Sequence, residues 1–555
     1  MAWQSANLLQ NMPMWDEFET VLSFIMDLRA SGSLGDSIAT FFATANEHVV
    51  LTSRMIFIVL YEITGKVNFT HLAIAGNTFV LAAMVILGRQ QNSRLFGWVC
   101  TAVGSLLIFQ MQHYENLFSS YASIDHFQIV LLTTGCLLLL VRGGLRPTLF
   151  AGLLAALAVF TLAHGVAVLA AGAAVLYLRS SRRAFFLWLG FGAVLFVALL
   201  LRLGSETLAP PPHVGVLGIK PFVVYWLTMV GGIPALGNPT LAMLAGILVL
   251  GLFGWLLTRK SFVADPFLSA LAINSIVACF LIAYGRVNSV GVPALSSRYM
   301  VQSAMIWAPV LLLAVKMLPS ERRVAIGSTL LVVLAAAFNV AANVQFTEEA
   351  DRFVQRRIDA ARYYDERGTF VGLRLPIFPK PQKADVIVAT AAREKIFEVR
   401  TERSREVVMP GSLTLYPIIF YFDKLALAAN NLHVRGWMLT KEYVSTDLAP
   451  HLLLQEGGKS FLFRGFTELR PDVTKANPDR MDTDESGFYF VVPRESVPAG
   501  SYNLRVVLLG QRRALYNETK RQVIFPAATV PPTPAAALPS GVPPVPTSPG
   551  TKPGN

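Results

Sequence analysis

The sequence is poor in charge, in cysteine and in familiar catalytic motifs. Only 15% of its 555 residues are charged, whereas soluble domains carry roughly a quarter, so an ordinary soluble enzyme is excluded. Its three cysteines, Cys100, Cys136 and Cys279, all lie in apolar stretches, which excludes a disulfide framework in the soluble parts. The patterns GxxxxGK[ST], HExxH, paired CxxC and GxSxG are all missing.

Apolar runs recur from Val67 to Asn343. A membrane-crossing helix needs about 20 such residues. We expect ten spans, at 67–88, 95–111, 124–141, 147–163, 164–178, 184–201, 241–257, 266–285, 299–317 and 324–343. The fourth and fifth are short and are expected to be half-helices or tilted. The sequence therefore predicts a polytopic α-helical membrane protein with about ten transmembrane helices, residues 67–345 forming its transmembrane domain.

Basic residues mark alternate connections between these spans. The net charge of +12 does not indicate nucleic-acid binding, because much of it lies in short loops, where it sets orientation. Twelve Lys and Arg residues occupy one set of connections and four occupy the other. The richer set is Arg89, Arg94, Arg142, Arg146, Arg179, Arg182, Arg183, Arg259, Lys260, Lys316, Arg322 and Arg323; the poorer set is Arg202, Lys220, Arg286 and Arg298. The positive-inside rule makes the richer set cytoplasmic, and a bacterial inner membrane is expected, with the carboxy-terminal domain in the periplasm.

Two outer segments precede and interrupt the spans. Residues 1–66 form an acidic first outer loop whose stretches 18–28 and 37–61 have the mixed polarity of interfacial helices. This loop contains no span and no convincing signal peptide, so we expect a further span upstream of Met1. In the second outer loop, 222–236 is expected to be re-entrant or surface-lying.

The carboxy-terminal third changes character. A helical linker at 346–383 is followed by short strand-like runs at 384–526, which predict a β-sandwich. These runs read ADVIVAT, REVVM, YPIIFYF, SFLFRGF, GFYFVV, YNLRVVLL and RQVIF. Residues 527–555 form a Pro-rich tail expected to be disordered.

Polar residues gather at the outer ends of the spans, and ionisable residues are nearly absent from the middle of them. This distribution favours an active site at the outer face over a transport pathway. The strongest candidates are Asp16 and Glu17, because a carboxylate at a membrane surface can act as a general base. The alternative is a solvated acidic turn before an interfacial helix.

Further candidates for substrate binding lie in the same loop and at helix ends. Glu47, His48 and Arg54 supply an acid, an imidazole and a cation, although Glu47 and Arg54 could equally form a structural ion pair. Asp125 and His126 begin a predicted span at its outer end. His126 could instead make a structural hydrogen bond there. His164 is expected to be a structural turn residue.

Arginine is unusual in the third outer loop, 285–298. Arg286 and Arg298 flank it, and Tyr299 opens the next span. Because guanidinium groups bind phosphate oxygens in bidentate fashion, a lipid-linked phosphate is one ligand for this pair. Snorkelling to lipid headgroups is the alternative.

This layout resembles that of the GT-C superfamily of membrane glycosyltransferases. The shared features are a carboxylate pair early in a long outer loop, interfacial helices, many spans and an outer carboxy-terminal domain. The resemblance covers the layout of residues 10–345 and implies a polyprenyl-phosphate sugar as donor. It implies Asp16 as catalytic base with Glu17 beside it, and Arg286, Arg298 and Tyr299 at the carrier phosphate. Relatives sometimes use a divalent cation near the acidic motif, although the sequence holds no strong metal-ligand set.

The β region carries a second likeness. The segments 433–439 (HVRGWML), 470–473 and 486–488 resemble an accessory β-sandwich attached to bacterial glycan-modifying enzymes. Such a module would bind or scaffold, and a purely structural domain is the alternative.

Three functional hypotheses follow. The first is an inverting transferase that moves a sugar to an envelope glycan, lipid or protein at the periplasmic face. The second is a polysaccharide polymerase or ligase of the O-antigen type, which would depend more on the outer arginines than on Asp16. The third is a transporter or a non-enzymatic envelope assembly protein.

Overall fold

The computed structural model describes two units of the chain, residues 1–401 and 402–555. The described residues of the first unit are 9–44, 48–178, 182–208, 219–287, 293–373 and 375–399. Those of the second are 414–415, 418–428, 431–440, 449–468, 470–477, 486–509 and 514–526. Each unit has its own main hydrophobic core.

Long apolar helices dominate the first unit. In its described part, seven helices are long and apolar enough to cross a membrane. They are α5 (Phe69–Arg89), α8 (Ser120–Arg142), α11 (Arg182–Leu208), α14 (Pro239–Thr258), α16 (Pro266–Arg286), α17 (Met300–Lys316, with the turn η5, Ser297–Tyr299, before it) and α18 (Glu321–Arg367). An eighth crossing results if α6 (Arg94–Ile108) and the segment Met111–Phe118, which are bent by 59° relative to each other, form one span. The prediction of a helical protein with several membrane-length helices is confirmed.

The remaining apolar segments are helical but short. The fourth and fifth expected spans are α9 (Leu145–Val159), with 15 residues, and η3 (Ala163–Val166) followed by α10 (Ala167–Leu178), with 12. At the turn between them, Gly165 lies so close to α9 that an added Cβ would stand 2.1 Å from the Ala158 carbonyl oxygen. The expected re-entrant segment contains α13 (Ile219–Val230), also 12 residues long, and η4 (Ile233–Ala235). Within the described residues, seven or eight helices rather than ten are long and apolar enough to cross a membrane.

Capping residues fix where the long helices begin. Asn68, Ser119 and Asp265 precede α5, α8 and α16, and each side chain accepts a backbone N–H of the first turn. Pro239 and Pro266 occupy the first positions of α14 and α16, where a missing N–H costs nothing. The short α15 (Ser261–Ala264) lies between these two helices.

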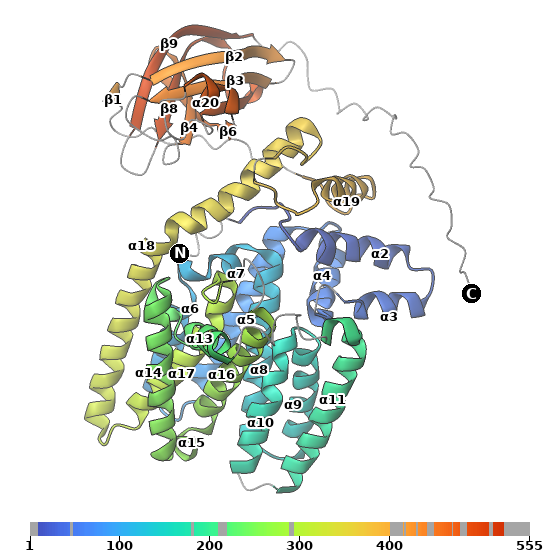
Figure 1. The fold of residues 1–555 in the computed structure, drawn as a ribbon, viewed down its shortest axis with the longest axis vertical. Helices are drawn as coiled ribbons and strands as arrows, with labels where there is room; N and C mark the ends of the chain where they lie inside the picture. The colour runs from blue at the N-terminus through green and yellow to red at the C-terminus, as the bar shows by residue number, and fades with distance from the viewer. Residues whose placement is uncertain are drawn as a thin grey trace. The chain divides into compact units, whose positions relative to one another are not determined.

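The amino-terminal segment folds into short helices at one end of this bundle (Figure 1). They are η1 (Phe18–Ser23), α2 (Phe24–Ala30), α3 (Leu34–Phe42) and α4 (Leu51–Thr64). Met55, Val59 and Ile63 form an exposed apolar stripe on α4 at four-residue spacing, as an interfacial helix requires. The stretch predicted as one helix at 37–61 is two helices.

The last long helix continues without a break into the expected linker. Helix α18 has 47 residues and ends where Gly368 adopts a left-handed conformation. At 1.5 Å per residue it is about 70 Å long, more than twice the roughly 30 Å hydrocarbon core of a bilayer. Its polar second half, which begins near Thr347, therefore extends beyond the apolar part.

The segment ADVIVAT is a helix, so its prediction as a strand is wrong. It lies in α19 (Pro381–Arg393), which packs against the amino-terminal helices. Ala384, Ile387, Val388 and Ala391 are its buried residues, and their spacing of three and four is helical. The β region consequently starts later than the predicted residue 384.

The second unit consists of two sheets around one core. The five-stranded sheet has the order β1-β9-β8-β4-β5 and the four-stranded sheet the order β2-β3-β7-β6. The strands are β1 (Thr414–Leu415), β2 (Ile418–Ala428), β3 (Asn431–Thr440), β4 (Ala449–Glu456), β5 (Lys459–Arg464), β6 (Phe466–Glu468), β7 (Gly487–Pro493), β8 (Gly500–Leu509) and β9 (Ala514–Phe525). Side chains of both sheets, such as Val434 and Phe490 from one and Leu454 and Val506 from the other, share the core.

Five of the predicted strand runs are confirmed. YPIIFYF overlaps β2, SFLFRGF spans β5 and β6, and GFYFVV, YNLRVVLL and RQVIF fall in β7, β8 and β9. REVVM and the tail at 527–555 lie outside the described residues. Residues 470–473 open a short helix, α20 (Pro471–Ala476), and Trp437 is partly buried and stacks on Tyr421.

Candidate functional site

The predicted acidic motif lies on a segment held down from several sides. The Trp15 N–H donates to the Ile377 carbonyl at 2.6 Å, which ties the motif to the chain before α19. Trp15 has a φ of 53°, a left-handed conformation that costs a non-glycine residue about 1–2 kcal/mol. Such strain persists where the surroundings fix the backbone, as the contact with Ile377 does here.

Glu17 is fully engaged. Its Oε1 atom accepts the hydroxyls of Ser119 and Ser120 at 2.8 and 2.7 Å and the Tyr121 N–H at 3.1 Å. Its Oε2 atom accepts the Met14 N–H at 2.8 Å and pairs with Arg357 Nη2 at 3.0 Å.

Both side chains of the Glu17–Arg357 pair are at most 2% exposed. Four hydrogen-bond donors and one ion-pair partner surround this buried carboxylate, so it is not available to take a proton from a substrate. Glu17 therefore anchors the motif to the start of α8 and to α18.

Asp16 is the opposite case. It is partly exposed, and no hydrogen bond or ion pair to its carboxylate is made by any residue in the described ranges. Its charge nevertheless acts electrostatically on His48, Asp125 and Arg298. Asp16 and three other predicted site residues therefore act on one another electrostatically.

Arg298 is the cation of this group. Its Nε atom donates to Glu115 Oε2 at 3.0 Å, and the guanidinium carbon lies 5.8 Å from the centre of the Trp15 ring. Nothing else in the described part of the chain accepts from its two Nη groups. These donors remain open to a ligand.

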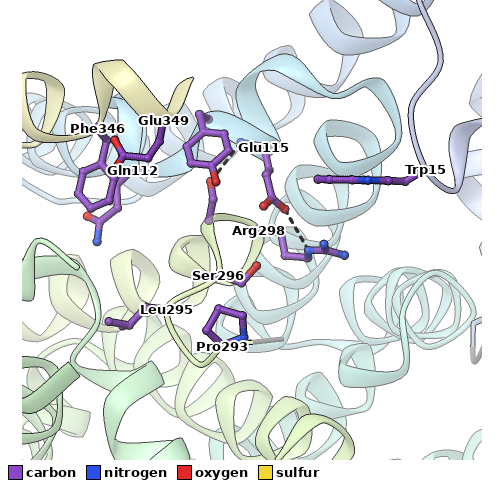
Figure 2. Close-up of a pocket in the computed structure, with 11 residues that line it drawn as sticks. Trp15, Gln112, Glu115, Pro293, Leu295, Ser296, Arg298, Phe346 and Glu349 are labelled. Carbon is purple, nitrogen blue, oxygen red and sulfur yellow. Dashed lines mark hydrogen bonds and ion pairs between the residues drawn. The ribbon is translucent and has the colours of Figure 1, made fainter. Parts of the chain in front are cut away.

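A cavity of about 300 Å³ lies beside Arg298 (Figure 2). Its lining residues come from the amino-terminal segment, the segment Met111–Phe118 before α8, the loop before α17 and the middle of α18. The lining residues are Trp15, Gln112, Tyr114, Glu115, Pro293, Leu295, Ser296, Ser297, Arg298, Phe346 and Glu349.

A buried polar cluster adjoins this site. The rings of His126 and His164 stack with centres 6.1 Å apart, and Tyr299 meets His126 edge-on at 5.9 Å. The Ser53 hydroxyl donates to Asp125 Oδ1, and Gln302 contacts His164 through side-chain nitrogens 3.3 Å apart. His164, expected to be a structural turn residue, is therefore part of the cluster that contains Asp125 and His126.

His48 and Arg54 support the loop between α3 and α4. The Ala163 N–H donates to His48 Nδ1 at 3.4 Å. Burial lowers the pKa of His48 to about 4, against the smaller opposing effect of Asp16, so its imidazole is neutral at pH 7. Arg54 Nη1 donates to the backbone carbonyls of Phe41, Ala43 and Val49, a bracing role. Glu47 lies outside the described residues.

The other predicted arginine is separate from the cavity. Arg286 is the last residue of α16 and is not among the described residues that line the cavity. Its proposed role at a phosphate stays a prediction.

Sequence reasoning missed three residues of the site: Trp15, Glu349 and Arg357. Glu349 and Arg357 are eight residues apart, with Phe353 between them, and so share one face of α18. That face meets the amino-terminal segment, since Phe353 packs on the Trp15 ring at 5.7 Å. The helical spacing was visible in the sequence, but the partner 340 residues upstream was not.

A divalent cation does not fit the described residues. No group of three His, Cys, Asp or Glu side chains among them is arranged to hold a metal ion. The charge of Asp16 also acts on a cation, Arg298, which would compete with a metal ion for that carboxylate. We therefore derive no step through a metal.

Comparison with known proteins yields no relative. No protein-family model, curated protein or solved structure matches this chain.

Proposed function

We propose that this protein is a membrane-embedded glycosyltransferase, which moves a sugar from a polyprenyl-phosphate carrier to a glycan, lipid or protein acceptor. The observation that carries the proposal is the contrast inside one motif. Asp16 is partly exposed and has no partner among the described residues, and its charge acts on Arg298, whereas Glu17 next to it is buried with four hydrogen-bond donors and an ion-pair partner. A carboxylate that can take a proton and a guanidinium whose Nη groups have no acceptor among the described residues are the two groups that an inverting transfer needs.

The transfer would proceed by one displacement. The acceptor hydroxyl gives its proton to the Asp16 carboxylate as its oxygen attacks the anomeric carbon of the donor sugar. The bond from that carbon to the phosphate oxygen breaks, and its electron pair leaves with the carrier phosphate. The Nη groups of Arg298 would stabilise that charge as it develops, because a guanidinium binds phosphate oxygens in pairs.

The positive-inside distribution supports placing this chemistry at the outer face of a bacterial inner membrane, with the β region in the periplasm. Long helices with exposed apolar faces support insertion: Val194, Val197 and Leu201 of α11 are at least half exposed. Labelling of Asp16→Cys and Arg182→Cys with a membrane-impermeant maleimide tests the orientation. The native cysteines are all buried, so they add little background. Asp16→Cys alone should react from outside, and equal reaction of both would contradict the proposal.

Comparison of surface glycans tests the function in cells. A deletion strain is complemented with the wild-type gene, with Asp16→Asn, or with Asp36→Asn. Asp36 is an exposed carboxylate of the same loop that accepts the hydroxyl of Ser33, the residue that caps α3. We expect glycan or glycoprotein loss in the deletion and Asp16→Asn strains and full rescue by Asp36→Asn. Rescue by Asp16→Asn together with failure of Arg298→Gln would favour the polymerase or ligase hypothesis. Unchanged glycans in every strain would favour a transporter or assembly protein.

A further inference from the structure

The cavity beside Arg298 has aromatic walls facing polar groups. Figure 2 shows Trp15 on one side and Phe346 with Glu349 on the other, while Pro293, Leu295 and Ser296 close one edge. At about 300 Å³ it is at the small end of the range for ligand pockets. A single hexose ring has the size and the two chemically different surfaces, C–H faces and hydroxyl edges, that such walls complement.

Some polar groups of the lining have partners, and others have none among the described residues. Glu115 is already neutralised by Arg298, 3.0 Å away. Glu349 is not: its carboxylate makes no hydrogen bond or ion pair with any residue that the structure describes, and its Oε2 atom is buried. The hydroxyl of Ser296 likewise has no described partner.

An unpartnered carboxylate in a cavity favours a particular kind of ligand. A buried acceptor without a donor is unfavourable, and a ligand N–H or O–H can supply the missing donor. Rotation about the last side-chain torsion of Glu349 exchanges its two oxygens, so either can meet a ligand. An ammonium group gains most from this carboxylate, a hydroxyl gains less, and a carboxylate on the ligand is repelled.

We propose that this cavity binds one hexose ring of the sugar substrate and selects amino sugars over neutral sugars and neutral sugars over uronic acids. Glu349 is the selecting residue, and Trp15 is the wall against which the ring packs. The inference rests on the proposed function, which it deepens by naming the substrate class. The location agrees with that function, because Trp15 is the residue before Asp16 and Arg298 borders both the cavity and the open carboxylate.

Binding of simple sugars to the purified full chain in lipid nanodiscs tests the selectivity. Saturation-transfer NMR with methyl glycosides of glucosamine, glucose and glucuronate gives three affinities. A charge-assisted hydrogen bond exceeds a neutral one by about 1 kcal/mol, so glucosamine should bind about fivefold more tightly than glucose. Glucuronate should bind most weakly.

Two matched variants locate the effect. Glu349→Gln keeps the shape and removes the charge, so glucosamine and glucose should bind within about twofold of each other. Glu348→Gln changes the next residue, which is 64% exposed and pairs with Arg352 on the surface, and should leave the ranking intact. Trp15→Ala should weaken all three sugars together.

The outcomes separate this inference from the proposed function. Equal affinities in the wild-type protein, tightest binding of glucuronate, an unchanged ranking in Glu349→Gln, or no binding of any sugar would overturn the inference. None of these results depends on turnover, so sugar transfer that requires Asp16 could still stand. Conversely, the expected ranking in a protein whose Asp16→Asn variant leaves surface glycans intact would keep the binding site and reject the transferase.

Discussion

Two neighbouring regions of the helical unit treat the same chemical group in opposite ways. Around Glu17, α8 and the amino-terminal segment supply four hydrogen-bond donors to one buried carboxylate, and α18 supplies an ion-pair partner, Arg357. Around Asp16, a carboxylate one residue away has no described donor and lies near a guanidinium with open N–H groups. The comparison teaches that the surroundings of an acidic residue are set by what reaches it in space. We call the surroundings of Glu17 the support region and those of Asp16, the proposed base, the reactive region.

The largest effect on stability is expected from removing Arg357, the ion-pair partner of Glu17 in the support region. Removing one partner of a buried ion pair leaves the other charge uncompensated, which costs about 3–5 kcal/mol. Arg357→Met should therefore lower the unfolding temperature of the detergent-solubilised protein strongly. The surface variant Glu348→Gln is the control and should behave as wild type, since exposed pairs contribute little. A small shift in Arg357→Met would show that Glu17 is not a structural anchor.

A smaller effect is expected from pH, through His48 at the edge of the reactive region. Its folded-state pKa of about 4 lies below the usual 6.5, so the unfolded chain binds the proton more readily. The stability from neutral His48 is complete above pH 6.5 and is lost as the pH falls toward 4, by up to about 3 kcal/mol.

The difference in free energy of unfolding between the wild type and His48→Gln should therefore depend on pH. Unfolding temperatures measured between pH 7.5 and 4.5 should converge for the two proteins as the pH falls. Parallel curves would mean that His48 keeps its ordinary pKa and is more solvated than the structure indicates.

The smallest effect on stability is expected from an exposed ion pair that touches neither Asp16 nor Glu17. Lys66 and Glu398 form an ion pair at 3.3 Å, and both side chains are more than half exposed. Exposed pairs of this kind contribute about 0–1 kcal/mol and are screened by salt. Lys66→Ala should leave thermal stability nearly unchanged, and a loss comparable to that of Arg357→Met would remove the contrast between buried and exposed charge.

Much of the helical unit could be read from the sequence, because apolar run length and capping residues are local signals. Asn68 and Ser119, for example, mark the starts of α5 and α8 directly. The α19 segment was misread because ADVIVAT is rich in β-branched residues, and its burial against the amino-terminal helices outweighs that preference.

The candidate site was predictable in composition but not in roles. Asp16, Glu17 and Arg298 were identifiable as unusual charges in the segments predicted to face outward, and the structure places Arg298 5.8 Å from the ring of Trp15, the residue before Asp16. The distinction between Asp16 and Glu17 depends on Arg357, 340 residues downstream, and on two serines at the start of α8. Contacts over such separations leave no local pattern, so only the fold reveals which carboxylate is free.

The most direct test of the reactive role of Asp16 is sugar transfer by purified, reconstituted protein. Wild type, Asp16→Asn and Asp36→Asn are supplied with a labelled polyprenyl-phosphate sugar and membrane acceptors, and their unfolding temperatures are measured in parallel. The account predicts that Asp16→Asn loses about 10²–10⁴-fold in transfer rate while its unfolding temperature and that of active Asp36→Asn match the wild type. Transfer by Asp16→Asn at the wild-type rate would contradict it.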